Sequence, residues 1–465
     1  MVSKTHLWVA WAFIMMGKYV STIEVDINEE QSIRSAAAIA VFNTMSSYTS
    51  NRTGEIPGNV GVSWWQSGVL MDILIQYWYF TGDTSNNPAV DQAMHYHQGE
   101  NNDYFSDKWN ILNDDHLAWG HAAMTAAEVD YPSIPSGPDW NTLAEGVFYS
   151  QISRWDNISC KGGVRLGILL DQSRESFIKN AAVNGGLFHL AARLARFTGS
   201  SFYADWAGRI WDWSAKTQLL NTDEWWVNDA VHATICAVES KFGSLYNFGQ
   251  YIRGTAYMYN ATNGENPQWK TRLDGLLERI FNNFFDYWRD EPKVLVGHEL
   301  YGSNGYENIA KGLFAADLAF VTMLAPYTAA EIIPRLQASA IGAARQCSGG
   351  DNHTLCNIHW GRHRPQRVWD GAESMEEQMS ATAVISASLI VFKNQSLTTG
   401  TSSYIIDPVK HDPDRTESHW RSWAFFVILL GGLFLIYKKK RKIYGSDDSA
   451  SSLRTLDMGK DIHHT

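Results

Sequence analysis

Apolar residues recur at intervals of three and four along most of this chain, which is the period of an α-helix with one or more buried faces. The segments between these periodic stretches are rich in Gly, Pro and Asn, and we find no convincing strand alternation. The pattern therefore predicts an all-α protein. The predicted helices span residues 32–48, 65–80, 115–129, 140–155, 181–197, 203–217, 249–259, 269–288, 311–324, 329–345 and 375–392.

Three helix ends look alike, with an aromatic residue followed by Thr or Asn and then Gly. They lie at residues 78–83, 195–200 and 258–264, and each Gly suits a left-handed C-cap. Their spacing is too loose for a strict repeat. Paired amphipathic helices without a sheet can bury their apolar faces by closing into an α/α toroid. We therefore expect one toroidal domain over residues 23–395.

The N-terminus has the features of a secretory signal peptide, which we place at residues 1–22. Lys4 supplies a positive charge, residues 7–16 an apolar core, and Ser21 and Thr22 small residues for cleavage. Several Asn-X-Ser/Thr sequons follow, and behind a signal peptide they indicate a glycosylated domain on the exoplasmic side. The acceptor residues are Asn51, Asn157, Asn260, Asn352 and Asn394.

The C-terminal composition predicts a membrane anchor. Residues 396–419 turn polar, as in a stalk, and residues 420–437 are almost entirely apolar. A basic cluster opens the remaining segment, 438–465, so we expect one transmembrane helix with a cytoplasmic tail. The alternative is a glycolipid-anchor signal with its attachment site at 400–403. Such signals normally end in their hydrophobic tail, whereas this chain continues past Tyr437.

The cysteines predict disulfides and not a metal site. Their number is four, which is even, and no CxxC or His/Cys ligand spacing is present. Cys347 and Cys356 are close enough in sequence to close one loop, which leaves Cys160 and Cys236 for a long-range bridge. We expect no metal and no cofactor.

Charge and aromatic content bear on the class of ligand. The net charge of −11 argues against nucleic acid, which binds basic grooves. The chain has 20 Trp, and Trp stacks its flat face on sugar rings or bases while its N–H reaches a polar partner. Most of these residues are expected in a helical core. The net negative charge fits an acidic cleft that binds a neutral polymer better than a groove that binds nucleic acid.

The sequence Asn113-Asp114-Asp115, at the start of the predicted helix 115–129, is the main candidate for chemistry. Adjacent carboxylates repel each other and are poor core residues. The same side chains could instead N-cap the helix, because short polar groups bind its free N–H groups and acids suit the positive end of its dipole. The residues alone leave both interpretations open.

A series of motifs surrounds this pair, in order over about residues 25 to 393. They are Trp-Trp-Gln-Ser-Gly (64–68), Tyr-Trp-Tyr-Phe-Thr-Gly-Asp (77–83), Asn-Asp-Asp-His-Leu-Ala-Trp-Gly (113–120), Met-Thr-Ala-Ala-Glu (124–128), Arg-Trp-Asp (154–156), Cys-Lys-Gly-Gly-Val-Arg (160–165), Lys-Asn (179–180), Asn-Gly (184–185), Ala-Ala-Arg-Leu-Ala-Arg (191–196), Tyr-Asn-Phe-Gly (246–249) and Gln-Met-Ser-Ala (378–381). Together they resemble the fungal branch of glycoside hydrolase family 76, the mannan endo-1,6-α-mannosidase-like proteins of cell-wall assembly. The resemblance implies an (α/α)6 barrel with the Asp pair in a central cleft.

The resemblance also implies catalytic roles. In the family the first Asp of the pair is taken as the nucleophile and the second as the acid/base, which carries these roles to Asp114 and Asp115. A retaining glycosidase needs two carboxyl groups roughly 5–5.5 Å apart, one ionised and one protonated. Neighbouring acids raise each other's pKa, which helps to keep one of them protonated. His116 stands where the family usually has Gln, so we expect it to alter the pKa of the neighbouring acid or the subsite.

Several aromatic residues are candidates for stacking on sugar. Trp64 and Trp119 could form platforms at the barrel mouth or could pack in the core, whereas Trp65 is expected to point into the helix bundle. Trp225 and Trp226 lie in a polar, loop-like stretch that suits a subsite, although core packing is an equal alternative.

Polar residues complete the predicted substrate site. Asp229 aligns loosely with an Asp that the family places in its cleft, and it could instead cap the next helix. The resemblance places further polar residues near the cleft floor, where they would otherwise be a solvated helix start. This set consists of Asn113, Lys179, Asn180 and Asn184. Glu128 is expected to pair with a buried Arg and not to act in chemistry.

These observations favour a membrane-tethered, retaining α-1,6-mannan glycosidase or transglycosylase. Its partner would be α-1,6-linked mannan or the mannose core of a glycolipid anchor, and transfer would occur if a sugar replaced water as the acceptor. A non-catalytic mannan receptor on the same fold is the alternative, but both acids remain. A polysaccharide lyase would need a Tyr or His base and cations opposite a uronate, and no such cluster is visible. We expect the domain on the exoplasmic side of the plasma membrane or an endomembrane.

Overall fold

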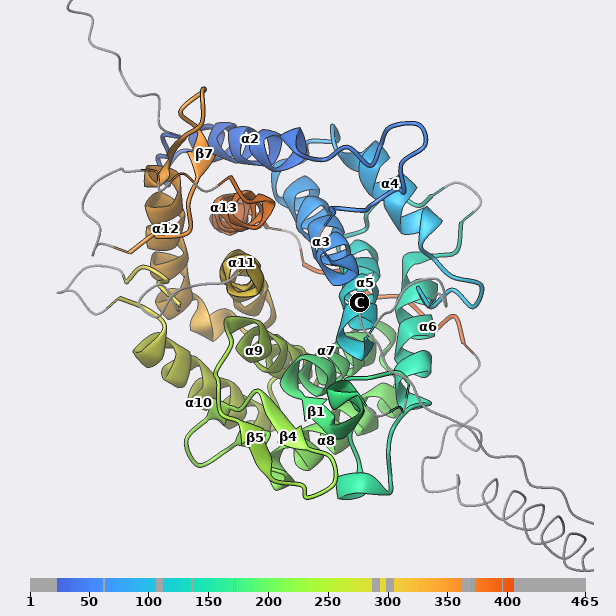
Figure 1. Ribbon diagram of the computed structural model, residues 1–465. Coiled ribbons are helices and arrows are strands. Elements are labelled where there is room, and N and C mark those ends of the chain that lie inside the picture. The colour runs from blue at the N-terminus through green and yellow to red at the C-terminus, as the bar shows by residue number, and fades with distance from the viewer. Residues whose placement is uncertain are drawn as a thin grey trace, which may run out of the picture. The chain divides into compact units, whose positions relative to one another are not determined.

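The computed structural model of this 465-residue chain describes residues 23–404, except for residues 62, 106–111, 135–136, 170, 172, 287–292, 298–304, 362–368, 370, 372 and 395. Most of the described chain is α-helical (Figure 1). The helices are α2 (Glu30–Ser46), α3 (Trp64–Thr81), α4 (Asn87–Tyr96), α5 (Asn113–Glu128), α6 (Trp140–Ile152), α7 (Ala181–Thr198), α8 (Ser201–Lys216), α9 (Leu245–Ala261), α10 (Pro267–Asn283), α11 (Gly305–Leu324), α12 (Ala329–Arg345) and α13 (Met375–Ala387).

Alternate helices form a closed inner ring. α3 packs against α5, α5 against α7, and the series continues through α9, α11 and α13, which returns to α3 (Figure 1). The remaining helices lie outside this ring. α4 packs on α3, α6 on α5, α8 on α7, α10 on α9, α12 on α11 and α13, and α2 on α13. The predicted toroid of helix pairs is therefore confirmed as a helical barrel.

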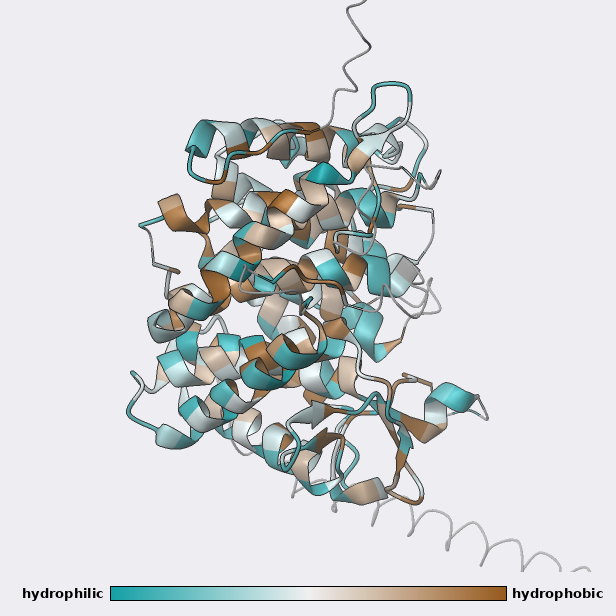
Figure 2. Ribbon diagram, turned by 90° about the vertical axis from the view of Figure 1, so that its left-hand side faces the viewer, coloured by the Kyte–Doolittle hydropathy of each residue, from teal (hydrophilic) through white to brown (hydrophobic). Residues whose placement is uncertain are grey.

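Inner and outer helices differ in how much of their surface is buried. Every residue of α3 from Gln66 to Tyr77 is buried, as expected for a helix enclosed on all sides. In the outer helix α10, by contrast, burial follows the three- and four-residue period of one face, which includes Trp269, Leu273, Leu276, Leu277 and Ile280. Figure 2 shows hydrophilic and hydrophobic residues mixed along the helices of the surface.

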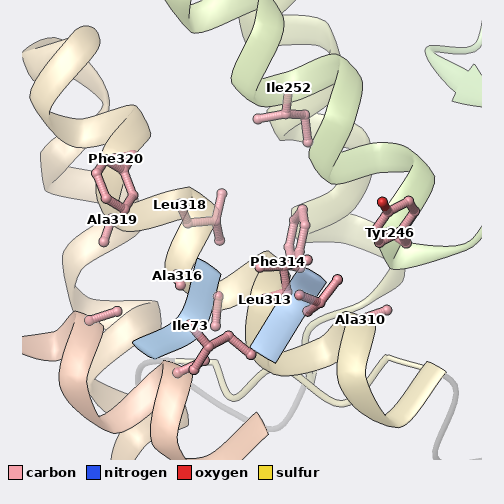
Figure 3. Packing of buried hydrophobic residues seen from close by; sticks show 14 of the residues in the cluster. Ile73, Tyr246, Ile252, Ala310, Leu313, Phe314, Ala316, Leu318, Ala319 and Phe320 are labelled. Atoms are coloured by element: carbon pink, nitrogen blue, oxygen red, sulfur yellow. The ribbon is translucent and has the colours of Figure 1, made fainter. Parts of the chain in front are cut away.

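Side chains from α3, α9 and α11 meet inside the ring. Figure 3 shows Ile73 of α3 beside the apolar residues of α11, with Tyr246 and Ile252 of α9 facing Phe314 from the other side. Ile73, Ile252 and Phe314 are at most 1% exposed. The apolar core of the barrel is therefore continuous across helices that lie far apart in the sequence.

The helix ends agree with the predicted capping. The Ser63 N–H donates to Gln66 Oε1 at 3.1 Å at the start of α3, which is half of a capping box. Gly82 and Gly199 end α3 and α7 with φ of 74° and 69°, and Gly264 after α9 has φ of 71°. The helix α4 was not predicted, because it is short and buries few of its residues.

Short strands were also not predicted, so the fold is mostly helical and not purely helical. β1 (Ile178–Asn180), β4 (Ala230–His232) and β5 (Val238–Ser240) form one antiparallel sheet in the order β1-β4-β5. β2 (Leu220–Asn221) pairs with β3 (Trp226–Val227), and β6 (Cys347–Gly349) with β7 (Leu355–Cys356). Two or three residues are too few for apolar and polar positions to alternate visibly.

Both predicted disulfides are present. Cys160–Cys236 joins the 3₁₀ turn η1 (Ser159–Lys161) to the turn between β4 and β5, and Cys347–Cys356 joins β6 to β7. The first bridge crosses between two loops, and the second closes a single hairpin.

The first residues of the predicted stalk, 396–404, are described, and some of them contact the barrel. Arg196 donates to the carbonyls of Leu397 and Thr398 at 2.8 and 2.9 Å, so these residues belong to the barrel. The signal peptide predicted at 1–22, the transmembrane helix at 420–437, the tail at 438–465 and the stalk residues 405–419 lie outside the described residues. Within the described ranges, no helix is long and apolar enough to cross a membrane.

Candidate active site

Asp114 and Asp115 lie in the first turn of α5, which the chain enters through the extended residue Leu112. The Leu112 N–H donates to Asp115 Oδ2 at 2.8 Å, and the Asp115 N–H donates to Asp114 Oδ1 at 3.1 Å. Asp115 therefore does cap the helix start, as the sequence allowed. Both side chains nevertheless stay partly exposed, so capping leaves surface for a ligand.

Asn113 fixes this turn and does not face the ligand. Its N–H donates to the Leu166 carbonyl at 3.0 Å, and its Nδ2 donates to the Arg165 carbonyl at 2.9 Å. Arg154 Nε donates to Asn113 Oδ1 at 2.8 Å. Because Asn113 is 1% exposed and its polar atoms are engaged, the structure does not bring it to the cavity surface.

His116 is buried behind the acid pair. Its Nδ1 faces Arg154 Nη2 at 3.0 Å and Gln151 Nε2 at 3.2 Å, while its Nε2 bonds the Asp103 carbonyl. Burial, and then the charge of Arg154, lower the pKa of His116 to about 3, so the ring is neutral. His116 therefore acts on the site by holding the arginine that binds Asn113.

A cavity of about 670 Å³ opens beside the acid pair, and Asp115 forms part of its wall. The start of α3 forms one side and the loop 167–175 another. Its described lining residues are Ile56, Asn59, Ser63, Trp64, Trp65, Ser67, His97, Leu112, Asp115, Gly167, Ile168, Leu169, Asp171, Ser173 and Glu175. This lining contains three carboxyl groups and, among the described residues, no Lys or Arg, so the cavity is acidic.

Trp64 and Trp119 are stacked, but only Trp64 reaches the cavity. Their ring centroids are 5.2 Å apart with an interplanar angle of 28°, and Trp64 Nε1 donates to His97 Nδ1 at 3.3 Å. Trp119 has no exposed surface and donates to the Trp64 carbonyl at 3.2 Å. Trp119 therefore packs behind Trp64, and the structure does not bring it to the cavity surface.

Trp65 lines the cavity and also packs against the core. It is partly exposed and packs edge-on against Tyr246 and Tyr306, with centroids 6.3 and 5.4 Å away. These tyrosines come from α9 and α11, on the far side of the ring. Because the ring of inner helices is closed, Tyr246 and Tyr306 supply aromatic contacts to Trp65 beside the cavity.

Asn180 contacts the acid pair from the neighbouring inner helix. Its side chain hydrogen-bonds Asp114, and its Oδ1 caps α7 by accepting from the Val183 N–H at 3.0 Å. The pairing of β1 with β4, which sets Asn180 opposite Ala230, holds it in place. The structure therefore brings Asn180 into the site.

Asp229 precedes β4 and lies beside the start of α7. Its carbonyl accepts from the Ala181 N–H at 2.8 Å, and its Oδ1 accepts from Asn247 Nδ2 at 3.2 Å. Because residues 180 and 181 bond this segment directly, Asp229 lies close to Asn180, although it is not among the lining residues of the cavity.

Lys179 and Asn184 stand behind the site and have no exposed surface. Lys179 Nζ donates to the carbonyls of Ser159 and Gly162 at 2.5 and 2.6 Å. Asn184 bonds both the N–H and the carbonyl of Val164, at 2.8 and 2.9 Å. Both residues therefore hold the loop that precedes the cavity wall, and the structure does not bring them to the cavity surface.

Trp225 and Trp226 are not part of this cavity. Trp226 packs against Phe248 and Phe284, with centroids 5.3 and 6.2 Å away, and donates to the Lys241 carbonyl at 3.0 Å. Trp225 faces α10 on the outside of the barrel. Neither side chain therefore joins the acid pair at this cavity.

The environment of the acid pair favours its protonated form. Burial, and then the charge of Asp115, raise the pKa of Asp114, and burial raises that of Asp115. Asn180 and backbone N–H groups oppose the shift but do not cancel it. The pair can therefore hold a proton close to neutral pH while one carboxyl group is ionised.

The loop 167–175 contributes carboxyl groups that the sequence interpretation missed. Hydrogen bonds from Ser173 and then Ser176 hold the pKa of Asp171 below its ordinary value, so Asp171 carries a charge at the cavity wall. Glu175 lies in the same wall. Two acids within a few residues of the motif at 160–165 were a signal that could have directed attention to this loop.

A helical barrel whose cavity wall combines one member of an adjacent acid pair with Trp side chains has the features of a glycoside hydrolase. Residues 32–400 match the profile of glycosyl hydrolase family 76. The chain is 33% identical over 378 residues to mannan endo-1,6-α-mannosidase DCW1 of Saccharomyces cerevisiae, covering 79% of this chain and 81% of that protein. This chain belongs to glycosyl hydrolase family 76.

Solved structures agree. Dfg5 from Chaetomium thermophilum, in complex with glucosamine, has a TM-score of 0.75 and 30% identity, covering 84% of this chain and 98% of that one. An inactive variant of an α-1,6-mannanase of Salegentibacter sp. HEL1_6, in complex with α-1,6-mannotriose, has a TM-score of 0.60 and 16% identity, covering 77% and 99%. The second comparison shows the common fold.

Proposed function

We propose that this chain is a retaining, endo-acting α-1,6-mannosidase or transglycosylase of fungal cell-wall assembly. Its substrate would be α-1,6-linked mannan or the mannose core of a glycolipid anchor. The observation that carries the proposal is the pair of adjacent, partly exposed carboxyl groups, Asp114 and Asp115, beside an aromatic cavity in a family 76 barrel.

Two further findings support this substrate class. DCW1 is named as a mannan endo-1,6-α-mannosidase, and the inactive bacterial mannanase carries Asn in place of two consecutive Asp residues. Between residues 32 and 400 of this chain, Asp114-Asp115 is the only pair of consecutive Asp residues.

The family resemblance assigns the roles within the pair, with Asp114 as the nucleophile and Asp115 as the acid/base. Asp114 accepts from Asn180 and from the Asp115 N–H, and both contacts favour its carboxylate form against its raised pKa. Asp115 lines the cavity, and its Oδ2 is fixed by the Leu112 N–H. Its other oxygen is the one that would carry the proton for the leaving glycosidic oxygen.

In the first step Asp114 would displace the leaving sugar, and Asp115 would give that sugar its proton. A covalent mannosyl-enzyme results, with inversion at the anomeric carbon. In the second step Asp115 takes a proton from the acceptor, whose oxygen displaces Asp114 and restores the original configuration. Water as acceptor gives hydrolysis, and a sugar hydroxyl gives transfer.

The cavity lining fits a neutral sugar chain. Trp64 offers a face held by Trp119 and His97, and Asp171 and Glu175 offer acceptors for hydroxyl groups. An anionic chain would meet three carboxyl groups and no described Lys or Arg. The charge of the cavity therefore favours mannan over a uronate-containing polymer.

The experiment is an assay of the purified protein with α-1,6-mannan oligosaccharides, with and without a sugar acceptor. The wild type should cleave or transfer them, and Asp114→Asn and Asp115→Asn should each abolish turnover. Asp274→Asn, a surface acid paired with Lys270, is the matched control and should retain activity. Chemical analysis of the first product should show the α-anomer, as double displacement requires.

Two results would contradict the proposal. Binding of mannan without turnover in the wild type would indicate a receptor on the same fold. Turnover that survives both substitutions would exclude this pair as the catalytic groups.

We also propose that the barrel is exoplasmic and tethered to a membrane by residues 420–437, after removal of residues 1–22. The sequons at Asn51, Asn352 and Asn394 have exposed acceptors, as glycosylation requires. Asn260 is a poorer acceptor, because its Nδ2 donates to the Leu324 carbonyl at 2.9 Å. Carbonate extraction of membranes, combined with glycosidase digestion, tests this arrangement. Release of an unmodified protein into the soluble fraction would exclude it.

A further inference from the structure

Residues of the outer helices α8 and α10, together with the β2–β3 turn, line a second cavity. Its volume is about 510 Å³, and none of its described lining residues is shared with the cavity beside Asp115. The residues that define it chemically are Trp211, Asp212, Thr222, Trp225, Gln268 and Arg272.

Arg272 is held rigidly at this cavity, but its hydrogen-bonding capacity is not used by the described chain. Its guanidinium lies 4.6 Å from the ring centroid of Trp211 and 4.3 Å from that of Trp269. Its carboxylate neighbour is Asp212, whose Oδ1 lies 3.7 Å from Arg272 Nη2, which is too long for a hydrogen bond. The side chain is 19% exposed. Its donors are therefore fixed in direction and available to a ligand.

Trp225 provides an aromatic wall. It is partly exposed, and its ring packs so closely on α10 that a Cβ at Gly275 would lie 2.2 Å from the indole Cε2. Trp225 itself has a φ of 53°, which is rare for a bulky residue. Its indole N–H finds no acceptor in the part of the chain that is described. Gly275 thus allows the ring to lie against the helix with part of its surface open to the cavity.

We propose that this cavity is a second glycan-binding site, which takes a neutral chain of hexoses. A sugar presents apolar C–H faces and hydroxyl groups that both donate and accept, and the cavity offers an aromatic ring, the donors of Arg272 and the acceptor Asp212. Asp212 is 77% exposed and opposes an anionic ligand. The identification of the chain as α-1,6-mannan rests on the proposed function.

Such a site would give the enzyme a second place at which to bind its polymeric substrate. A chain held at α8 and α10 stays near the cleft between encounters, which raises its effective concentration there. The gain applies to long chains that can reach both cavities and not to a single short oligosaccharide.

Affinity electrophoresis in gels that contain α-1,6-mannan tests the site. The full chain carries Asp114→Asn and Asp115→Asn, so that the polymer is not cleaved. In this background Trp225→Ala should weaken retardation by about fivefold to tenfold, on the scale of one aromatic contact. Gln268 is exposed, so Gln268→Ala keeps the fold and serves as a second test if Trp225→Ala does not fold. Gln268→Ala should weaken retardation by about twofold to threefold. Glu278→Ala, exposed on the same helix beyond Trp225, is the control and should leave retardation unchanged.

The outcomes separate this site from the proposed function. Equal retardation of the parent, Trp225→Ala and Gln268→Ala proteins would overturn the site, as would stronger retardation by a polyuronate than by mannan. If the wild type fails to cleave mannan but is retarded through Trp225, the site stands and the proposed function falls. If the wild type cleaves oligosaccharides and neither substitution changes retardation, the proposed function stands and the site falls.

Discussion

The two ends of helix α5 both carry carboxyl groups, and these groups are held in opposite ways. At its C-terminal end, Glu128 has no exposed surface, and its Oε2 accepts from Arg193 Nη2 at 2.8 Å and from the Tyr257 hydroxyl at 2.6 Å. At its N-terminal end, Asp114 and Asp115 are partly exposed and have no ion pair with a described Lys or Arg.

This difference in burial and pairing distinguishes a carboxylate that stabilises the fold from carboxyl groups that can act in catalysis. A buried acid opposite a fixed guanidinium serves the structure, because removing either partner leaves a buried charge without a counter-charge. Two neighbouring acids beside a cavity, with amide donors alone, have raised pKa values and can hold a proton between them. The expected pairing of Glu128 with a buried Arg is confirmed.

The largest expected effect is on turnover at the N-terminal end. Asp114→Asn and Asp115→Asn should each lower kcat/KM on α-1,6-mannan by about 10³-fold or more, because each removes a group that acts in the transition state. Circular dichroism should show the fold intact in both. A loss of kcat/KM below about tenfold in either variant would contradict a catalytic role for the acid at this end of α5.

The next effect is on stability at the C-terminal end. Glu128→Gln leaves the buried Arg193 without a counter-charge and should lower the free energy of unfolding by about 3–5 kcal/mol, measured by urea denaturation. Glu331→Gln, which removes a 68% exposed acid paired with Arg335, should cost less than about 1 kcal/mol. Equal costs in the two variants would contradict the distinction between a buried and a surface pair.

A smaller effect should separate the cavity Trp from a packed one. Trp64→Ala should lower kcat/KM by about tenfold through the lost stacking face, while the melting temperature changes little. Trp226→Ala should do the opposite, because Trp226 packs against Phe248 away from the cavity. Unchanged kinetics in Trp64→Ala would remove Trp64 from the substrate site.

The smallest effect is a dependence of stability on pH. Raised pKa values mean that the folded acid pair binds more protons than the unfolded one, whose pKa values lie near 3.8, so stability falls as pH rises from there towards neutral. Asp114→Asn should therefore stabilise the protein by about 1–2 kcal/mol at about pH 8 and hardly at all at about pH 3.5. Unfolding curves at both pH values measure this. A gain that is equal at both would exclude the raised pKa as its cause.

Local patterns predicted much of this protein correctly, since helix periods, glycine C-caps and cysteine spacing are properties of short segments. The inner ring, both disulfides and the Glu128–Arg193 pair followed from such patterns or from the family resemblance. The failures were of another kind. Trp65 and Trp119 differ in exposure although both are helical. The sequence of neither helix shows which of the two reaches the cavity.

The amino-acid sequence by itself determined the helical class, the domain, and the acid pair at the start of α5. Only the tertiary structure decided which polar residues face a ligand. Asn113, Lys179 and Asn184 look like binding groups in sequence, but closure of the ring buries them against loop carbonyls and turns them into supports. Periodicity gives a side chain's direction relative to its own helix, whereas exposure to a cavity depends on what the neighbouring helices place opposite it.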